Sequence, residues 1–379
     1  MAQDFSRTLE QGGQSGFYRS RQWFARVHLD LPLLLLLLVL SVSGLFILYS
    51  SSGGDLELVR KQAGHFSIGL IVLLITAQLP PRFYSSIAPW FYFVCLLGLL
   101  GVLLFGVGAK GAQRWLDLPG LPRFQPSELM KMALPLAVAW YMSKRSIPPK
   151  LSDLFKAFIF ILIPTLFILK QPDLGTSILV MTSGLAVMFF AGMSWRLIIS
   201  LLGLAAAAAP MMWFFVMRDY QKTRVLTFLS PESDPLGSGW NIIQSKTAIG
   251  SGGLQGKGWL MGSQSQLEFL PEGHTDFIIA VLAEEFGFVG VLLLLSLYFL
   301  IILRCLYLAT HCETLFGRLV SASLLAAFFI YIFVNIGMVS GILPIVGVPL
   351  PLISYGGTSV ISLLTAFGIL MSMCTHKRT

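Results

Sequence analysis

The sequence predicts an all-α polytopic membrane protein with about ten transmembrane helices and a large ordered outer loop between helices 7 and 8. Hydrophobic residues make up 55% of the 379 residues and charged residues only 12%, whereas soluble domains carry about 25% charged residues. The mean hydropathy of the chain is +0.78. Apolar windows long enough to cross a bilayer recur along the chain, and one long polar stretch, residues 217–275, interrupts them.

Each apolar window is about as long as a bilayer core is thick, at roughly 20 residues. The first window follows a basic leader, but it is too long for a signal-peptide core and lacks a small-residue cleavage site, so we expect an uncleaved span. The fifth and sixth are separated only by residues 170–173. We expect two spans there, because Pro172 and Asp173 are costly inside hydrocarbon. The predicted spans are 31–50, 63–79, 86–107, 127–143, 155–170, 174–191, 195–216, 276–303, 317–341 and 355–374.

The distribution of basic residues predicts the orientation of these spans. Placing the N-terminus inside puts more than half of the 26 lysines and arginines on the cytoplasmic side, as the positive-inside rule requires. Residues 1–30 and 375–379 are then cytoplasmic tails, 31–374 form one membrane domain, and the loop 217–275 faces outward. The net charge of +8 follows from this topology and predicts no nucleic-acid partner. The spacing of the four cysteines predicts neither a disulfide framework nor a zinc site.

Charged residues gather near the outer end of the fourth span. Lys110, Arg114 and Trp115 lie in the outer loop before it, where the tryptophan is either an interfacial anchor or a substrate contact. Glu128 and Lys131 are three residues apart, share a helix face and can pair. That pair is either a structural ion pair or part of a functional site, the usual meaning of charges inside a span. If both loops turn inward, Lys110, Arg114 and Lys131 form a cluster without matching carboxylates, as a pyrophosphate needs.

A second candidate site lies where the outer loop ends. A connection of this length is usually functional or disordered, and its aromatic residues, glycine turns and few charges indicate order. The eighth span is predicted to start at Asp276, whose carboxylate is either a helix cap or a functional group at the outer aqueous face. Glu272 and His274 precede it as candidate substrate-binding residues. Glu284 and Glu285 are expected to be buried partners of polar or basic groups on other spans.

The segment 340–359 connects the last two spans and contains three prolines, which cannot continue a helix. We expect a re-entrant outer loop that packs against protein or faces a cavity. Its Gly356-Gly357 step opens the last span and offers backbone N–H groups to an anion. No internal repeat is evident, which weighs mildly against a transporter built from inverted halves.

Short motifs in a fixed order cover nearly the whole chain, and on these motifs the chain resembles the SEDS family (shape, elongation, division, sporulation). Residues 263–266, where serine replaces the usual first threonine, and residues 343–351 resemble the rod-shape (RodA) branch more than the division (FtsW) branch. The motifs are Gly111–Trp115, Gln125–Glu128, Gln171–Thr176, Ala248–Gly252, Pro271–Phe277 and Ile353–Gly357.

The resemblance implies ten spans and a peptidoglycan glycan-chain polymerase of the bacterial inner membrane that acts on lipid II for cell elongation and rod shape. It also implies a class B penicillin-binding protein as the transpeptidase partner, together with other elongation-complex proteins and membrane lipids. Asp276 corresponds to the aspartate that the family holds essential. Lys110, Arg114, Trp115, Glu128 and Lys131 are carried over as substrate-binding residues.

The residues fit that chemistry. The donor is a growing glycan on undecaprenyl pyrophosphate and the acceptor is the 4-hydroxyl of lipid II. Pyrophosphate is a good leaving group that needs no general acid, unlike the sugar alkoxide of glycoside hydrolysis. One carboxylate, Asp276, is therefore sufficient to take the hydroxyl proton. Cationic side chains, or a divalent cation such as Mg²⁺ or Mn²⁺, stabilise the leaving charge, and in-line attack inverts the anomeric centre.

Three alternatives stay open. Asp276 acts either as a base or as a metal ligand. A lipid II flippase makes no bond and needs a polar path through both leaflets, whereas the charges here gather at the outer end. A non-catalytic scaffold that recruits the transpeptidase leaves Asp276 without a purpose.

Overall fold

The computed structural model describes residues 28–109, 112–117, 124–215, 217, 222, 226, 230, 239–266, 269–270 and 273–376. Within these residues, long helices coincide with the ten predicted windows. They are α2 (Leu31–Ser51), α3 (Leu56–Gln78), α4 (Pro81–Phe105), α5 (Pro126–Met142), α6 (Leu151–Lys170), α7 (Leu174–Phe190), α8 (Trp195–Phe215), α12 (Ile278–Thr310), α13 (Leu315–Val339) and α14 (Gly357–Thr375).

The all-α polytopic class is confirmed. In the part of the chain that the structure describes, 7 helices are long and apolar enough to cross a membrane, namely α2, α3, α4, α6, α12, α13 and α14. Helices α5 and α7 have only 17 residues each, so the count of ten spans stays a prediction. The predicted tail 1–30 lies outside the described residues except for its last three.

Capping side chains set several helix starts. Asp30 accepts a hydrogen bond from the Leu33 N–H at 3.0 Å at the start of α2. Asp173 accepts one from the Thr176 N–H at 3.2 Å and caps α7. These caps satisfy N–H groups that have no partner inside the helix. Because α6 ends at Lys170 and α7 starts at Leu174, the separation of the fifth and sixth spans is confirmed.

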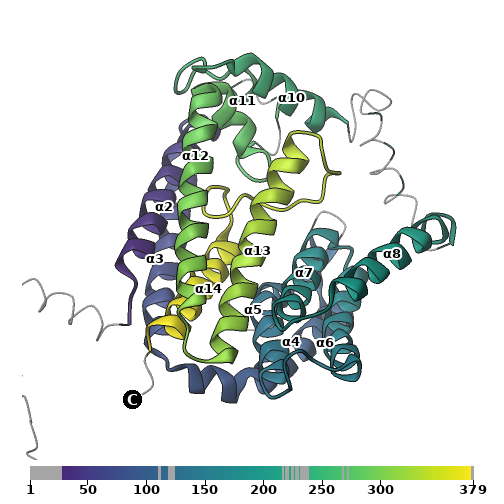
Figure 1. Ribbon diagram of the computed structural model, residues 1–379. Helices are drawn as coiled ribbons and strands as arrows, with labels where there is room; N and C mark the ends of the chain where they lie inside the picture. Colours follow the sequence, from purple (N-terminus) through teal and green to yellow (C-terminus); the bar gives the residue numbers. More distant parts are fainter. Residues whose placement is uncertain are drawn as a thin grey trace, which may run out of the picture.

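The helices form two groups that meet at α5, α7 and α13 (Figure 1). Helices α2, α3, α12, α13 and α14 make up one group, and α4 to α8 make up the other. In the first group α3 packs along α14, and in the second α4 packs on α5 and α6 on α7. Contacts of α13 with α7 and α5 join the two groups.

A short hairpin departs from the all-helical pattern. Strand β1 (Val107–Ala109) pairs antiparallel with β2 (Ala112–Trp115), and a bridge joins Leu116 to Phe124. The hairpin turns the chain back toward the start of α5. It therefore brings Arg114 and Trp115 close to the first turn of that helix. This is the arrangement that the sequence analysis described for an outer loop that turns inward.

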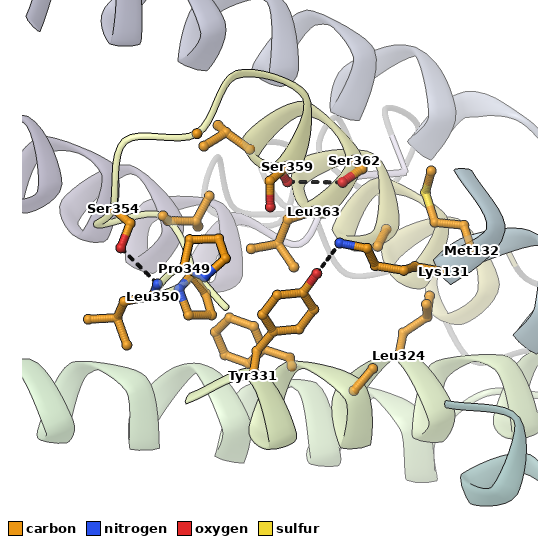
Figure 2. Close-up of a pocket in the computed structure, with 17 residues that line it drawn as sticks. Lys131, Met132, Leu324, Tyr331, Pro349, Leu350, Ser354, Ser359, Ser362 and Leu363 are labelled. Atoms are coloured by element: carbon orange, nitrogen blue, oxygen red, sulfur yellow. Dashed lines mark hydrogen bonds between the residues drawn. The ribbon is translucent and has the colours of Figure 1, made fainter. Parts of the chain in front are cut away.

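The proline-rich segment between α13 and α14 is not helical, as expected. Its backbone is tied to the helices around it: Tyr298 donates its hydroxyl to the Pro351 carbonyl at 2.6 Å, and the Gln62 amide donates to the Ser354 carbonyl at 3.2 Å. The Ser354 hydroxyl accepts from the Leu350 N–H at 2.7 Å (Figure 2). These bonds replace the water that is absent at membrane depth.

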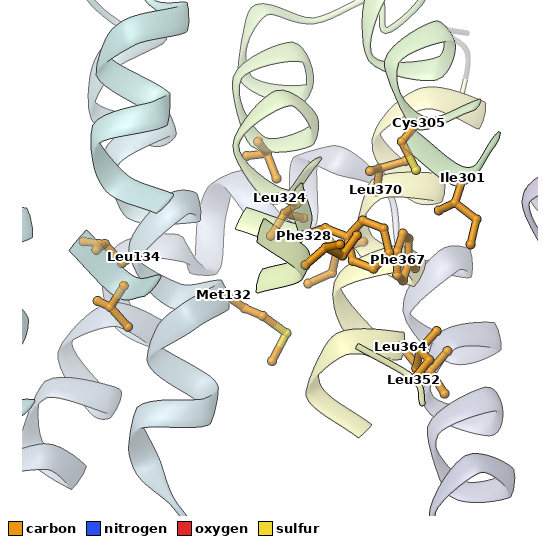
Figure 3. Packing of buried hydrophobic residues seen from close by; sticks show 14 of the residues in the cluster. Met132, Leu134, Ile301, Cys305, Leu324, Phe328, Leu352, Leu364, Phe367 and Leu370 are labelled. Carbon is orange, nitrogen blue, oxygen red and sulfur yellow. The ribbon is translucent and has the colours of Figure 1, made fainter. Parts of the chain in front are cut away.

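The core between the helices is apolar. Phe328 on α13 and Phe367 on α14 meet edge to face with ring centroids 5.1 Å apart. Leu364, Leu370 and Cys305 lie around them in one buried cluster (Figure 3). Large apolar side chains also cover the outside of the helices, where a bilayer is the solvent.

The described part of the outer loop is ordered, and it is docked on a break in α12. It contains α10 (Trp240–Gly252) and α11 (Ser263–Gln266), and these lie over the end of α12 in Figure 1. Gly287 has φ 64° and ψ −163° and interrupts α12. The loop backbone forms hydrogen bonds with the backbone of α12 on either side of the break. Gly258 N–H donates to Glu285 O at 2.9 Å, and Phe288 N–H donates to Gly253 O at 2.9 Å.

Buried carboxylates reinforce this docking. Glu284 accepts from the Lys257 ammonium at 2.7 Å and from the Ser263 hydroxyl at 3.0 Å. Glu285 accepts from the Ser50 hydroxyl on α2 at 2.5 Å. The prediction of partners on other spans is thus right for Glu285. It is wrong for Glu284, because the loop folds back over α12 and supplies the partners itself.

At the opposite end of the bundle, Cys312 and Cys374 lie side by side, with Cα atoms 4.4 Å apart. The cysteine spacing did not predict this contact, because the turn after α12 and the end of α14 meet only in the folded chain. His28 and His376 stack beside them with ring centroids 3.6 Å apart. Burial lowers the pKa of His376, so its ring stays neutral near neutral pH.

The close approach of α10 to α12 predicts the effect of a single methyl group. A Cβ on Gly252 would lie 1.9 Å from the Ala283 carbonyl oxygen. We expect Gly252→Ala to destabilise the protein by about 1–3 kcal/mol through overpacking, and to speed proteolysis of the loop. Gly250→Ala is the matched control, because nothing lies within 4 Å of that position. Equal apparent melting temperatures for the two purified variants would contradict the docking.

Candidate active site

A cavity of about 770 Å³ lies between α3, β2, α5, α7, α13 and the segment 347–361. Its charged and histidine side chains come from four separate elements: His65, Arg114, Glu128 with Lys131, and Asp173. A smaller cavity of about 50 Å³ adjoins it and shares Lys131 in its lining. The tertiary structure therefore brings Arg114 of the outer loop next to Glu128 and Lys131 of the fourth span.

Lys131 and Glu128 form a buried ion pair in the wall of this cavity. The Lys131 ammonium lies 2.6 Å from Glu128 Oε1 and also donates to the Tyr331 hydroxyl (Figure 2). The Ser362 hydroxyl on α14 donates to Glu128 Oε2 at 2.7 Å. The pair is structural, since it links three helices. It also faces the cavity, and its part in a functional site stays a prediction.

Arg114 is paired more loosely. Its Nη2 donates to the Pro172 carbonyl at 2.9 Å, and its Nε lies 3.7 Å from Asp173 Oδ2. The Gln125 amide also donates to Asp173 Oδ2, at 3.2 Å. Asp173 thus holds the start of α7, the hairpin and the start of α5 together.

These contacts correct one expectation from the sequence. The cations were expected to lack matching carboxylates, but Lys131 faces Glu128 and Arg114 faces Asp173. The sequence hid the second pair because 59 positions separate its members. Lys110, the third cation, lies outside the described residues, so its place in the cluster stays a prediction.

Asp276 lies at the edge of the same cavity. Its Oδ2 is 3.5 Å from where a Cβ would stand on Gly347, a cavity-lining glycine with φ +74°. The Asn335 amide donates to the Asp276 carbonyl at 2.8 Å and to the Val348 carbonyl at 2.7 Å. One buried side chain therefore fixes the aspartate against the proline-rich segment.

The eighth helix begins later than predicted. Helix α12 starts at Ile278 with Phe277 as its N-cap residue, so Asp276 belongs to the turn before the helix and is not the N-cap residue. In that turn the His274 carbonyl accepts from the Tyr355 N–H at 3.0 Å. This bond ties the turn to the start of α14. Glu272 lies outside the described residues.

Comparison with known proteins agrees with this architecture. A family model described as "Cell cycle protein", of the FtsW/RodA/SpoVE type, matches residues 23–379.

The chain belongs to this family.

Two similar proteins are named as peptidoglycan glycosyltransferases. The peptidoglycan glycosyltransferase MrdB of Escherichia coli K12 is 54% identical over 358 residues, which cover 94% of this chain and 96% of that protein. A probable peptidoglycan glycosyltransferase FtsW of Trichlorobacter lovleyi is 35% identical, with coverage of 93% and 95%.

Solved structures share the fold of this FtsW/RodA/SpoVE-family chain. One solved structure concerns the structural coordination of polymerization and crosslinking by a peptidoglycan synthase complex. A chain in that structure superposes with a TM-score of 0.80 at 33% identity. The match covers 90% of this chain and 96% of that one. Thermus thermophilus RodA gives a TM-score of 0.69 at 31% identity, with coverage of 90% and 95%.

The cavity also contains residues that the sequence analysis did not select. Asp173 lies inside the recognised motif Gln171–Thr176, so the resemblance carried a signal for it. Tyr331, and Ser362 in the smaller cavity, gave no local signal, because a tyrosine or a serine in a span is usually structural. His65 is a lone histidine on α3 and reaches the cavity only through the packing of α3 on α14.

A preformed metal site is not evident in the described part of the chain. No three His, Cys, Asp or Glu side chains gather there as a ligand set. A divalent cation therefore fits this site only if one carboxylate holds it together with substrate phosphate oxygens, which is a common arrangement for Mg²⁺.

The buried pair predicts a non-additive effect on stability. Lys131→Met leaves the Glu128 carboxylate buried without its cation, which we expect to cost about 3–5 kcal/mol. The double variant Glu128→Gln/Lys131→Met removes both charges, and we expect its apparent melting temperature to recover toward that of the unmodified protein. A double variant no more stable than Lys131→Met would contradict this role for the pair.

Proposed function

We propose that this FtsW/RodA/SpoVE-family chain is a peptidoglycan glycosyltransferase that polymerises glycan strands from lipid II for cell elongation and rod shape. The observation that carries the proposal is the single cavity that combines Arg114, Trp115, Glu128 and Lys131 with Asp276 at its edge. The 54% identity to the glycosyltransferase MrdB supports the same activity.

In the proposed reaction, the 4-hydroxyl of lipid II attacks the anomeric carbon of the growing glycan. A new C–O bond forms there, while the bond between that carbon and the diphosphate breaks. Asp276 takes the hydroxyl proton as general base, and undecaprenyl diphosphate leaves with the electron pair of the broken bond. Attack from the face opposite the leaving group inverts the configuration.

The cavity offers two different kinds of cation for the leaving group. Lys131 is held by Glu128, Tyr331 and the helices around them, so it is a fixed positive end of a neutral pair. The Arg114 side chain is 35% exposed and lies 3.7 Å from its carboxylate, so it can turn toward a diphosphate at little cost. Fixed charges that need no reorganisation are what transition-state stabilisation requires.

Asp276 is also the carboxylate that would hold a divalent cation such as Mg²⁺ or Mn²⁺. The cation would supply further positive charge to the leaving diphosphate. Asp276 as base and Asp276 as metal ligand both require the carboxylate at the edge of the cavity, beside Gly347. The neighbouring glycine leaves room for either.

Two rival functions make different demands on the structure. A lipid II flippase needs a polar route through both leaflets, whereas the described core around α13 and α14 is apolar (Figure 3). A scaffold needs no carboxylate beside a cavity of about 770 Å³. Both rivals are therefore less well supported than the transferase.

Asp276→Asn tests the transferase directly. We expect the purified variant to insert and to bind its partner but to lose glycan polymerisation by more than about a hundredfold, since general-base catalysis contributes about 10²–10⁴ in rate. The measurement is the conversion of labelled lipid II to polymer on a gel.

The matched control is Glu57→Gln, which neutralises an exposed carboxylate on α3 and should leave the rate unchanged. Near-normal polymerisation by Asp276→Asn would reject Asp276 as base and as metal ligand. Lipid II translocation without polymer formation by the unmodified protein would favour the flippase.

The proposed location is the bacterial inner membrane, with both termini cytoplasmic and the cavity toward the outer leaflet. The multi-pass membrane character rests on the apolar helices and the family. The positive-inside distribution supports the orientation, and lipid II would then enter from the leaflet in which peptidoglycan is assembled.

We further propose a single-span class B penicillin-binding protein as partner, packed on α12 and α13. The similar chain in a peptidoglycan synthase complex supports a partner of this kind. Gly317, Ser321 and Ser323 of α13 are buried inside this chain, so they cannot form the contact. Phe329 and Phe333 instead stack on the exposed side of α13 with ring centroids 6.2 Å apart.

The double variant Phe329→Ala/Phe333→Ala tests this surface. We expect it to lower co-purification of the partner by about tenfold or more, because two aromatic anchors are lost, while the stability of the chain alone changes little. Phe93→Ala, an exposed phenylalanine on α4, is the control. Undiminished co-purification would place the partner on another surface.

A further inference from the structure

His65 lies in the wall of the cavity, on α3, and packs against the first residue of α14. Its Cε1 and Nε2 atoms are each 3.2 Å from the point where a Cβ on Gly357 would stand. The edge of its ring also faces Tyr355, with centroids 6.4 Å apart. The glycine at 357 therefore makes room for the imidazole beside the cavity.

One ring nitrogen of His65 is unsatisfied. Its Nδ1 is buried and has no hydrogen-bond partner in the structure. A buried polar atom left in this state is unfavourable, so it needs an explanation such as a functional role. The side chain lines the cavity, so a ligand that enters it meets the imidazole ring, and rotation of the ring would bring Nδ1 to that ligand.

The charges that face His65 leave a specific gap. Across the cavity, Arg114 is paired with Asp173 and Lys131 with Glu128, so the two pairs cancel. Asp276 at the edge adds negative charge, and the hydroxyl-bearing side chains of Tyr331 and Tyr355 also line the cavity. On its own helix, one turn away, the exposed Lys61 is paired with Glu57 at 2.6 Å.

A diphosphate that enters this cavity meets no net positive charge from the described lining residues. Histidine is the side chain that ordinarily changes its charge between about pH 5 and 8. Among the described residues that line the cavity, His65 is therefore the group able to add a cation when an anion binds. A charge-assisted hydrogen bond to phosphate oxygen is stronger than a neutral one.

We propose that His65 is a substrate-binding residue that contacts the diphosphate of the lipid-linked glycan and takes up one proton from solvent as it binds. The inference rests on the proposed function, because it places the diphosphate in this cavity. The protonated ring donates to a phosphate oxygen and offsets part of the ligand's charge. His65 thus binds donor and product through the same group.

The experiment measures binding of undecaprenyl diphosphate to the purified full chain from about pH 6 to about pH 8.5, the range around histidine titration. We expect the affinity of the unmodified protein to fall as the pH rises, by up to about tenfold per pH unit for one linked proton. Ionisation of the ligand itself acts in the opposite direction. His65→Gln should bind less tightly at the low end, lose the fall with pH and match the unmodified protein at the high end.

Two further variants keep the test decisive if His65→Gln folds poorly. Gly357→Ala pushes a methyl group against the imidazole and should weaken binding at low pH without replacing the histidine. In the double variant His65→Gln/Gly357→Ala the two losses of affinity should not add, because both act through His65. His311→Gln, an exposed histidine at the other end of α12, is the matched control and should behave as the unmodified protein.

The outcomes separate this inference from the proposed function. A pH dependence in His65→Gln or in Gly357→Ala equal to that of the unmodified protein overturns the role of His65, even if all the proteins polymerise lipid II. The role is also overturned if His65→Gln weakens binding of a dodecyl detergent without a diphosphate as much as binding of undecaprenyl diphosphate. The diphosphate must be what His65 recognises. Failure of the unmodified protein to polymerise lipid II rejects the proposed function instead.

Discussion

The break in α12 at Gly287 is the constraint on which the outer half of the protein depends. A helix interrupted at membrane depth leaves backbone N–H and C=O groups that water cannot reach. The segment 253–258 satisfies them, Glu284 anchors the same segment through Lys257, and Glu285 binds Ser50 on α2. The outer loop is thus a structural part of the membrane domain.

This docking also fixes the walls of the cavity. Helix α10 packs on α12, and the Ser245 hydroxyl donates to the Val339 carbonyl at the end of α13 at 3.0 Å. The turn that carries Asp276 leads into α12, and the segment that carries Gly347 leaves α13. By holding both helix ends, α10 sets the separation between the aspartate and the opposite wall, and proximity of this kind is a large part of catalysis.

The cavity is built from compensated charges. Each cation that the structure describes in its wall has a carboxylate beside it, which is how a membrane domain can keep charges at depth without a large desolvation cost. This pairing of charges stabilises the cavity wall, but it leaves a diphosphate without a net positive environment. The ligand must therefore turn a loosely held group such as Arg114 toward itself or bring its own counter-charge through a proton or a divalent cation.

The sequence by itself determined the membrane class, the approximate helix positions, the non-helical proline-rich segment and the family, because each of these is written in local patterns of apolar residues, prolines and short motifs. It also indicated Arg114, Glu128, Lys131 and Asp276 as candidate site residues. Only the tertiary structure decided the pairing of Arg114 with Asp173, the loop partners of Glu284, and the entry of His65 into the cavity. Those contacts join residues far apart in the chain, and their geometry depends on how whole helices pack, which no local pattern specifies.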